Sequence, residues 1–545
     1  MKDFVTPTIL AYLVFWIWPI CIFLFFRFFS IQRAICLSIV GAYLLLPAYL
    51  QFDFPVLPKL DKHLMPGVVT LLCVILAMKW REYAEVQAQR HRVEEPEPRP
   101  YAELNSWLPK SWIGTIVILL FIFYPIGTML SNQDIQVFAD TVLPGHTPRD
   151  IPSNIIKSLL IIIPFLLARR FLGDPKAHTL LLWVIVFGAL AYILPTLYEV
   201  RLSPQLHKDL YGYYSQGFQQ TKRGDGFRPV VFLQHGLYLA LFLTVSLFAV
   251  VGFLKSELSR NKKILLAGAA LVLMMTLILA KSLGALLIFL MFVPILFFGT
   301  VRLQLIFASC MALALLSYPF IRGSHVMPVE EIIDFAYLQA PERAQSLEFR
   351  FDNEEILLDR ALERPVFGWG GWGRSRVYNH KGVDISTADG AWIITLGTNG
   401  YVGYFSKFIW LALPLFALAL VARRYNVTQP TATLAMILGA NLIYLIPNAG
   451  ISVMTYVIAG ALMGRAELGK LGEPTVETQE RRLELIRTNG AAARTIYDQP
   501  NATVAKYVRA GNFVNEGVKT RDSRIVRRRP GSRIQRRQKR VFNKP

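Results

Sequence analysis

Runs of about 20 apolar residues recur along this chain, and each is long enough to cross the hydrocarbon core of a bilayer as an α-helix. Backbone N–H and C=O groups inside lipid must be hydrogen-bonded within the segment, so such runs fold as helices. Of the 545 residues, 54% are hydrophobic and 17% are charged, whereas soluble domains carry about 25% charged residues. These features exclude a soluble protein of this length and predict an all-α, polytopic transmembrane helix bundle.

The apolar runs define twelve to thirteen expected spans. The first run has no small-residue cleavage site and further spans follow it, which predicts a retained helix rather than a removed signal peptide. The count depends on the first span and on the short fifth and ninth spans, and it changes by one if one of them does not cross the membrane. The spans cover approximately residues 7–28, 34–51, a third run that ends near 78, 112–130, 155–167, 179–198, 230–254, 264–280, 285–298, 303–320, 401–422, 432–446 and 451–463.

Basic residues cluster at alternate ends of the expected spans. Positive charge beside a helix end marks the cytoplasmic side of a membrane. With thirteen spans the clusters alternate without conflict, so the N-terminus and the links 131–152, 199–228 and 321–400 are predicted outside and the C-terminus in the cytoplasm. The clusters assigned to the cytoplasmic side are Arg27 and Arg33, Lys79 and Arg81, Arg169, Arg170 and Lys176, the group from Lys255 to Lys263, Arg302, Arg423 and Arg424, and the C-terminal tail.

The residues after Arg465 carry much of the formal net charge of +21 and end in RIVRRRPGSRIQRRQKRVFNKP. A block of like charges is typical of a solvated, disordered tail. Anionic lipid head groups attract such a tail by about 1 kcal/mol for each basic residue near the surface. We therefore expect anionic lipids as a partner of the tail and no nucleic acid.

The four cysteines, Cys21, Cys36, Cys73 and Cys310, all lie in apolar runs. No metal-ligand spacing joins them and none lies in a loop, so they are expected to pack as small apolar side chains. The chain also has no His-Glu-x-x-His motif and no cluster of aspartates. GWGGWG is rich in glycine, but it follows no expected strand and lacks the Lys-Ser/Thr pair of a phosphate-binding loop. Neither a metal nor a cofactor is expected.

The segment from Arg350 to Gly403 is the longest polar stretch between apolar runs. It reads RFDNEEILLDRALERPVFGWGGWGRSRVYNHKGVDISTADGAWIITLGTNGYVG and concentrates glycine, tryptophan, arginine and carboxylate residues. Loops held by a rigid scaffold are free to expose polar groups and often carry function. We expect most of an active site here.

Three further outward-facing pieces carry charge near the ends of apolar runs. Glu199 and Arg201 stand at the end of the sixth span, and Lys281 stands at the turn between the eighth and the ninth. Arg228 opens the seventh span and His235 lies two turns in, so their spacing of seven puts them on one helical face. Ionisable groups within a span usually face a cavity and mark functional sites. The alternatives are that Arg228 only snorkels to the interface and that Lys281 only marks a helix end.

Arginines gather in these outward segments, and Arg350, Arg374 and Arg376 lie in the polar stretch itself. Guanidinium groups bind phosphate with two hydrogen bonds and stay charged in a low-dielectric site. ATP is not supplied outside the membrane, so a phosphate bound there is expected to belong to a lipid-linked donor. A nearby carboxylate or imidazole would then act as general base toward a sugar hydroxyl. Alternatively, Arg350 is a surface arginine of an amphipathic helix, and Arg374 and Arg376 are solvated charges beside glycine-rich turns.

One spaced pattern runs through the polar stretch: Arg350-x14-Pro365-x2-Gly368-x-Gly370, then Asp389-Gly-x-Trp-Ile, then Gly400-x-x-Gly403. It resembles the O-antigen ligase and O-antigen polymerase superfamily, whose members typically show an arginine, a helix that ends in a Pro-x-x-Gly-x-Gly turn, a His-Asn-x-x-Leu motif and a Gly-x-x-Gly entering the next span. RPVVFLQHGL is similar to the family's arginine-containing entry to a middle helix, and KSLGAL is similar to its Ser-Arg-Gly-Ala turn. The resemblance covers a core at 199–464 that includes the loop 321–400, and leaves N-terminal helices (1–198) and the basic cytoplasmic tail (465–545) outside it.

The resemblance implies a GT-C-like glycosyltransferase of the bacterial inner membrane, independent of metal, with one long periplasmic loop and a periplasmic active site. The family's donor is an undecaprenyl-diphosphate-linked glycan, and its acceptor is a glycan or a lipid-linked acceptor. The family's arginines bind the diphosphate, so Arg228 and Arg350 carry over as catalytic residues together with Asp389. The residues expected to bind substrate are Arg201, His235, Lys281, Arg374, Arg376 and His380.

One position departs from the family pattern. Counted back from Gly400 and Gly403, the family's histidine falls on Asp389 and its asparagine falls on Gly390. An ionised carboxylate can act as a base but is weaker than imidazole. The departure favours a polymerase, or a transferase to another acceptor, over a lipid A-core ligase. His380, nine residues earlier, is an alternative base, and a non-catalytic relative is an alternative identity.

Two other classes of protein remain open. A flippase or secondary transporter of glycan lipids is expected to carry charges at mid-membrane and Gly/Pro-broken helix pairs in matched halves, neither of which is visible in the sequence. A scaffold membrane protein that works through its basic tail is the other alternative.

Overall fold

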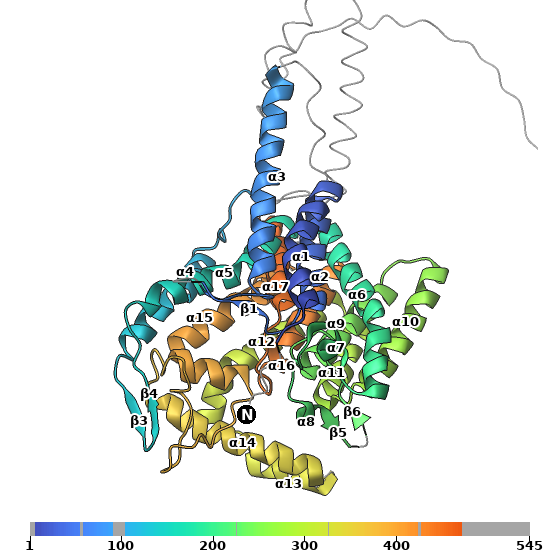
Figure 1. The fold of residues 1–545 in the computed structure, drawn as a ribbon. Helices are drawn as coiled ribbons and strands as arrows, with labels where there is room; N and C mark the ends of the chain where they lie inside the picture. The colour runs from blue at the N-terminus through green and yellow to red at the C-terminus, as the bar shows by residue number, and fades with distance from the viewer. Residues whose placement is uncertain are drawn as a thin grey trace, which may run out of the picture. The chain divides into compact units, whose positions relative to one another are not determined.

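The computed structural model describes residues 6–54, 58–90, 104–224, 226–324, 326–339, 341–422 and 427–470. Each of the thirteen expected spans coincides with a helix (Figure 1). Arg423, Arg424 and the expected basic tail beyond residue 470 lie outside the described residues. The thirteen helices are α1 (Ile9–Phe28), α2 (Ile31–Leu45), α3 (Met65–Arg90), α4 (Trp112–Leu130), α5 (Asp150–Phe171), α6 (Pro175–Leu202), α9 (Gly236–Leu254), α10 (Arg260–Leu279), α11 (Leu283–Phe298), α12 (Val301–Gly323), α15 (Ala391–Val421), α16 (Gln429–Tyr444) and α17 (Val453–Lys470).

Within the described ranges, eight of these helices are long and apolar enough to cross a bilayer, namely α1, α4, α5, α6, α9, α10, α12 and α15. Helices α2 and α11 and the first part of α3 (Met65–Trp80) are apolar but shorter. The expected all-α bundle of the multi-pass membrane class is confirmed at this level. The number of helices that reach the length and hydropathy of a span is smaller than the twelve to thirteen expected.

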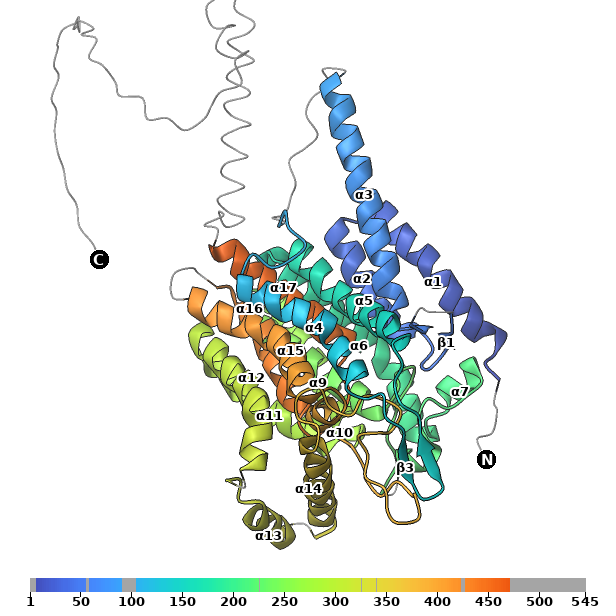
Figure 2. The same ribbon diagram turned by 90° about the vertical axis from the view of Figure 1, so that its left-hand side faces the viewer.

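Shorter elements connect the long helices, and many of them gather at one end of the bundle. In both views the β3–β4 hairpin, α13 and α14 lie at the end opposite to the C-terminal end of α3 (Figures 1 and 2). Three antiparallel, two-stranded hairpins lie within the described ranges. The connecting elements are β1 (Gln51–Phe52) paired with β2 (Leu60–Asp61), β3 (Gln136–Phe138) paired with β4 (Thr141–Leu143), β5 (Lys222–Arg223) paired with β6 (Gly226–Phe227), and the helices α7 (Leu206–Tyr211), α8 (Phe218–Thr221), α13 (Val329–Gln339) and α14 (Pro341–Leu362).

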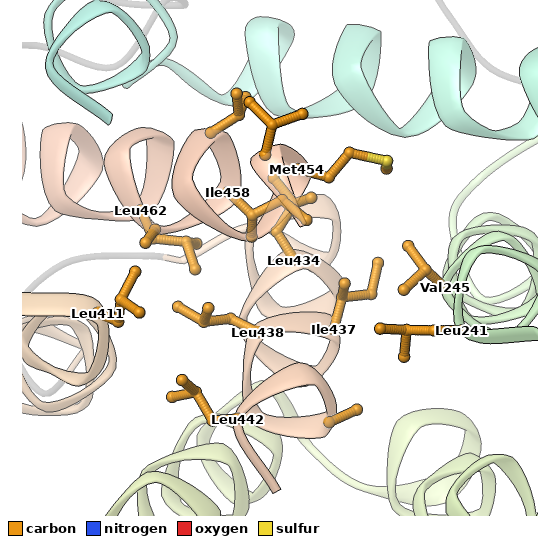
Figure 3. Close-up of a cluster of buried hydrophobic side chains, with 14 of the residues drawn as sticks. Leu241, Val245, Leu411, Leu434, Ile437, Leu438, Leu442, Met454, Ile458 and Leu462 are labelled. Atoms are coloured by element: carbon orange, nitrogen blue, oxygen red, sulfur yellow. The ribbon is translucent and has the colours of Figure 1, made fainter. Parts of the chain in front are cut away.

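The centre of the bundle is packed around α16. This helix is apolar on nearly all sides and is buried along most of its length, as expected of a helix surrounded by other helices. Helices in lipid associate through close van der Waals packing rather than through the hydrophobic effect. The side chains that meet here come from α9, α15, α16 and α17 and include Leu241, Val245, Leu411, Leu434, Ile437, Leu438, Leu442, Met454, Ile458 and Leu462 (Figure 3).

Two glycines spaced by four residues bring α17 onto α5. A Cβ atom at Gly460 would lie 2.2 Å from the carbonyl oxygen of Phe165, and one at Gly464 would lie 2.3 Å from that of Arg169. Small residues at this spacing allow two helix backbones to approach closely. At the same contact the buried guanidinium of Arg169 bonds to the carboxylate of Glu467, so these two closely packed helices are also joined by an ion pair.

A break in α15 connects the membrane bundle to the polar segment. Gly400 has φ 63° and ψ −170° inside α15, a conformation open to glycine because it has no Cβ. The break lets Tyr401 N–H donate to the carbonyl of Pro365 (2.7 Å), and Gly370 N–H donate to the carbonyl of Thr398 (2.8 Å). The Pro-x-x-Gly-x-Gly turn and the Gly-x-x-Gly helix entry seen in the sequence are therefore two halves of one backbone contact.

The seventh span begins later than expected. The predicted run starts at residue 230, but α9 starts at Gly236, and His235 is its N-cap. Val231 has φ 55°, a left-handed conformation that is unusual for a β-branched residue and incompatible with a right-handed helix at this position. The prediction that Arg228 and His235 share one helical face is therefore wrong, because residues 228–235 form an irregular entry to the helix.

Candidate active site

Helix α14 carries Arg350 and is fastened along one buried face. Ala344, Phe351, Leu358 and Ala361 are buried along it at helical spacing. The side chain of Asn353 accepts a hydrogen bond from Thr387 N–H (2.6 Å). This polar contact ties α14 to the segment that precedes α15, where Asp389 lies.

Arg350 and Asp389 form an ion pair at the meeting point of three segments. Arg350 Nε lies 3.6 Å from Asp389 Oδ2, and the two side chains are 37% and 45% exposed. Arg350 Nη1 also donates to the carbonyl of Pro447, at 3.4 Å. The N–H of Ala391, two residues after Asp389, donates to the carbonyls of Leu445 and Asn448 at 3.0 Å each. The turn after α16 thus holds both the start of α15 and the arginine.

The ion pair stands in a wall between two cavities. One cavity, of about 300 Å³, is called here the Arg350 cavity. A smaller neighbour of about 250 Å³ shares Arg350, Asp389 and Pro447 with it. The residues lining the Arg350 cavity are Tyr49, Gln234, His235, Leu237, Tyr238, Leu241, Arg350, Asp389, Tyr444, Pro447, Asn448, Ala449 and Gly450. Sequence reasoning placed Arg350, Asp389 and His235 in one site, and the structure brings these three together.

His235 is a neutral hydrogen-bond donor in this cavity. Its Nδ1 accepts the N–H of Leu237 at 3.0 Å, as the N-cap of α9. An imidazole that accepts at Nδ1 carries its proton on Nε2. Burial, with Arg228 and Arg223 nearby, lowers the pKa of His235 to about 4, so the ring is uncharged at neutral pH.

Arg228 lies behind His235 and does not line the Arg350 cavity. Its side chain is buried and passes over Gly236, where a Cβ atom would meet Arg228 Cδ at 2.4 Å. Arg228 Nη2 donates to the carbonyl of Lys281 (3.4 Å), and Lys281 Nζ donates to the carbonyl of Arg223 (2.9 Å). Arg228 and Lys281 are thus brought together, one layer behind the cavity, where they add positive potential to it.

Glu199 fixes the irregular entry to α9. Its Oε2 accepts the N–H groups of Val230 and Val231, both at 2.7 Å, and its Oε1 accepts that of Leu206 at 3.2 Å. A buried carboxylate that receives three backbone N–H groups orders the chain around it. Arg201, two residues later, is exposed at the end of α6 and lines none of the cavities described here.

Arg374 lies in a separate cluster. Its side chain is fully buried and bonds to the carbonyls of Trp369 (3.0 Å), Asp134 (2.7 Å) and Pro144 (3.1 Å) and to Asp134 Oδ1 (3.0 Å). Arg364 pairs with the same carboxylate at 2.8 Å. The hydrogen bond from Arg364, helped by the charges of both arginines, lowers the pKa of Asp134 to about 2. This Asp134 cluster joins the two ends of the β3–β4 hairpin, at Asp134 and Pro144, to the turn after α14.

Arg376 and His380 lie farther out on the same segment. Arg376 Nη1 pairs with Asp384 Oδ2 at 2.9 Å across a short bridge between Tyr378 and Asp384. His380 is exposed at the tip of this turn. Neither side chain lines the cavities around Arg350, so the structure does not bring them to Asp389.

Glu354 is a group that sequence reasoning missed. It lines the smaller cavity with Arg350 and Asp389, and it accepts hydrogen bonds from Trp392 Nε1 (3.1 Å) and Tyr318 OH (3.2 Å). Burial raises the pKa of this carboxyl. The signal that could have found it is its position four residues after Arg350, on the same face of one helix.

A third cavity adjoins the Arg350 cavity. It has a volume of about 610 Å³ and is called here the α5 cavity, because one face of α5 lines it. The two cavities share Gln234 and Tyr238. Together they give the site room for two ligands side by side, with Asp389 at one end.

The chemistry available here is anion binding beside a proton acceptor. Arg350 offers charged donors, His235 offers a neutral donor, and Asp389 offers a carboxylate. Across the described residues, no group of three or more His, Cys, Asp or Glu side chains is placed to hold a metal ion. Comparison with protein-family models, with curated proteins and with solved structures finds no match to this chain.

Proposed function

We propose that this chain is a membrane glycosyltransferase that polymerises or ligates glycan from an undecaprenyl-diphosphate-linked donor at the periplasmic face of a bacterial inner membrane. The observation that carries the proposal is the Arg350–Asp389 pair in the wall shared by two cavities, with neutral His235 beside it. The spaced pattern from Arg350 to Gly403 adds the resemblance to O-antigen ligases and polymerases.

In the proposed reaction an acceptor hydroxyl attacks the anomeric carbon of the donor sugar. The new C–O bond forms as the bond from that carbon to the diphosphate oxygen breaks, and the electron pair leaves with the diphosphate. Asp389 accepts the hydroxyl proton as general base. Arg350 stabilises the charge that develops on the leaving diphosphate, and a preformed donor of this kind typically contributes several kcal/mol. Arg228 and Lys281 support the same charge from behind His235.

His235 and Glu354 have supporting roles in this proposal. The Nε2–H of His235 donates to a phosphate or sugar oxygen, since its Nδ1 is already used by Leu237 N–H. Glu354 holds Trp392 at the start of α15 and keeps α14 in register with it. A carboxyl with a raised pKa can also take the part of a proton relay to the smaller cavity.

The test is turnover of a lipid-linked oligosaccharide by the purified full chain in liposomes. Arg350→Ala and Asp389→Ala are expected to abolish formation of longer or transferred glycan while protein yield stays normal. Asp352→Ala is the matched control, because Asp352 is an exposed carboxylate on α14 outside these cavities. Normal product from Asp389→Ala would overturn the proposal.

A glycan-lipid flippase or transporter is the second candidate, favoured by one observation. Lys407, a charge inside an expected span that the sequence interpretation did not identify, lies in the middle of α15, beyond its break at Gly400. Its Nζ bonds to Thr395 Oγ1 at 3.2 Å. An ionisable residue inside a broken helix is typical of transporters. The liposome assay separates the two, since an enzyme changes the length or attachment of the glycan, whereas a flippase changes only the leaflet in which the lipid resides. Lys407→Met would abolish the second activity and spare the first.

A further inference from the structure

The α5 cavity is a built polar site that the reaction above does not use. Its walls come from five parts of the chain: the region of the β1–β2 hairpin, one face of α5, Gln234 and Tyr238 at the start of α9, the polar segment at Trp372, and the start of α17. Most of its lining lies in the first 198 residues, outside the part of the chain that resembles a known family. Its volume of about 610 Å³ is within the range of about 300–1,000 Å³ of sites that hold small molecules.

One face of α5 supplies closely spaced polar groups to this cavity. Asp150, Ser153, Asn154 and Lys157 follow one another at intervals of three, one and three residues and all line it. This spacing puts them on one side of a helix. A hydroxyl, an amide, a carboxylate and an ammonium group then offer both hydrogen-bond donors and acceptors along a single rigid element.

The charges of the cavity nearly balance, which argues against an anionic ligand. Asp53, Asp61 and Asp150 stand against Lys59 and Lys157. The carboxylates are already engaged: Asp53 pairs with Lys59 at 3.5 Å, Asp61 accepts the N–H of residue 63 at 2.9 Å, and Asp150 accepts that of residue 147 at 2.7 Å. A diphosphate would meet more negative than positive groups here. A ligand with many hydroxyls and little charge fits this lining better.

Trp372 provides a flat aromatic face at the edge of the cavity. Trp372 is 54% exposed, and its indole stacks on His146, with ring centroids 4.4 Å apart and planes inclined by 29°. Its backbone has φ 60°, a conformation that costs a tryptophan free energy and persists only where neighbours enforce it. His146 is itself held by Gly371 N–H at 3.2 Å. The C–H face of a sugar ring carries slight positive charge and packs well on such a ring.

We infer that the α5 cavity binds the acceptor as a carbohydrate, with a sugar ring stacked on Trp372 and its hydroxyls bonded to the α5 face. The identification of the bound carbohydrate as the acceptor rests on the proposed function, whereas the sugar site itself rests on the lining described above. Because Gln234 and Tyr238 line both cavities, a glycan bound here extends toward Asp389. The acceptor is thus recognised through its sugars and not through a phosphate or a lipid anchor.

The test uses the purified full chain and the repeat-unit oligosaccharide released by mild acid from the host's surface polysaccharide. Titration calorimetry without donor is expected to show binding to the unmodified chain. Trp372→Ala is expected to weaken it by about tenfold, the scale of one lost aromatic contact, and Trp372→Phe by less. Ser153→Phe fills the cavity from the α5 side, so it tests the same site without altering Trp372. In turnover, both are expected to raise the acceptor KM and leave the donor KM within about twofold.

The outcomes separate this inference from the proposed reaction. Absence of oligosaccharide binding by the unmodified chain, or unchanged binding by both Trp372→Ala and Ser153→Phe, overturns the sugar site. If Asp389→Asn then abolishes turnover all the same, the reaction stands and the sugar site alone has failed. If Asp389→Asn keeps full turnover while the two cavity variants lose oligosaccharide binding, the sugar site stands and the assigned reaction centre has failed.

Discussion

Arg350 and Arg374 belong to the same polar segment and each pairs with an aspartate, Arg350 with Asp389 of that segment and Arg374 with Asp134 from a distant part of the chain. Their surroundings differ. Arg374 is fully buried and directs its donors to three carbonyls and to Asp134. Arg350 is 37% exposed, lies 3.6 Å from Asp389, and borders two cavities. The difference shows which arginine can receive a ligand: a guanidinium whose donors are used up holds structure, and one with donors facing a cavity can bind an anion.

The largest effect is expected from Asp389→Asn, which keeps the shape of the side chain but removes its ability to accept a proton. Turnover should fall by about 10²- to 10⁴-fold, the usual contribution of a general base, while the unfolding temperature in detergent changes little. Single-turnover kinetics with lipid-linked oligosaccharide would measure it. If Asp389→Asn lost as much unfolding free energy as an Arg374 variant, the Arg350–Asp389 and Arg374–Asp134 pairs would have the same structural role. That result would contradict the difference described above.

Arg374→Ala should show the opposite behaviour. The guanidinium of Arg374 is buried, although its partner Asp134 is 41% exposed. Removal of this guanidinium leaves three carbonyls and part of Asp134 without a donor, and such a loss typically costs about 1–3 kcal/mol. The free energy of unfolding in detergent is the measurement. If Arg374→Ala folded as stably as the unmodified chain and lost only activity, Arg374 would belong with Arg350.

As the pH falls, the entry to α9 (residues 228–238) and the segment around Asp134 (residues 131–146) should open at different pH values. The pKa of His235 is lowered from 6.5 to about 4, so the stability tied to its neutral form is complete above pH 6.5 and is lost as pH falls through 4. The pKa of Asp134 is lowered from 3.8 to about 2, so its contribution is complete above pH 3.8 and is lost as pH falls through 2. Hydrogen exchange, corrected for intrinsic rates, should therefore rise in residues 228–238 before it rises in residues 131–146.

His235→Gln is the control for this order, because Gln offers an acceptor oxygen to Leu237 N–H but has no proton to gain. Exchange in residues 228–238 should then no longer rise through protonation of residue 235 as the pH falls from 6.5 to 4. Simultaneous opening of both regions in the unmodified chain would show that they unfold as one unit.

The smallest effect is expected from Arg376→Ala. Arg376 and Asp384 form an exposed pair at 2.9 Å on the same segment, and exposed pairs contribute about 0–1 kcal/mol. The unfolding free energy should thus stay within about 1 kcal/mol of the unmodified chain. A cost near that of Arg374→Ala would mean that the buried and exposed arginines of this segment cannot be told apart by burial.

The long helices were predictable because length and hydropathy determine what can lie in lipid. Every expected span coincides with a helix, although α2 ends at Leu45 rather than near 51 and α15 begins at Ala391 rather than at 401. The additional turns of α15 were hidden because the Gly400 break looks like a helix start in sequence.

The site was predictable only in part. Arg350 and Asp389 were chosen from spacing and resemblance, and the structure does place them together. The prediction of a shared helical face for Arg228 and His235 failed because Glu199 binds the N–H groups of Val230 and Val231. These contacts span 31 and 32 residues, and no local pattern reveals them. Trp372 was also beyond reach, since its role depends on His146, which is more than 200 residues away in the chain.

The break at Gly400 has a mechanical consequence. Trp369 and Gly370 donate backbone hydrogen bonds to the part of α15 before Gly400. Tyr401 and Val402, just after Gly400, donate to the carbonyls of residues 365 and 366. The turn after α14 is therefore bonded to α15 on both sides of the break. The part of α15 after Gly400 therefore cannot tilt without moving the turn after α14. That turn is continuous with the C-terminal end of α14, the helix that carries Arg350. Displacement of Arg350 by a ligand would be transmitted, through rigid backbone rather than through side chains, into the membrane half of α15.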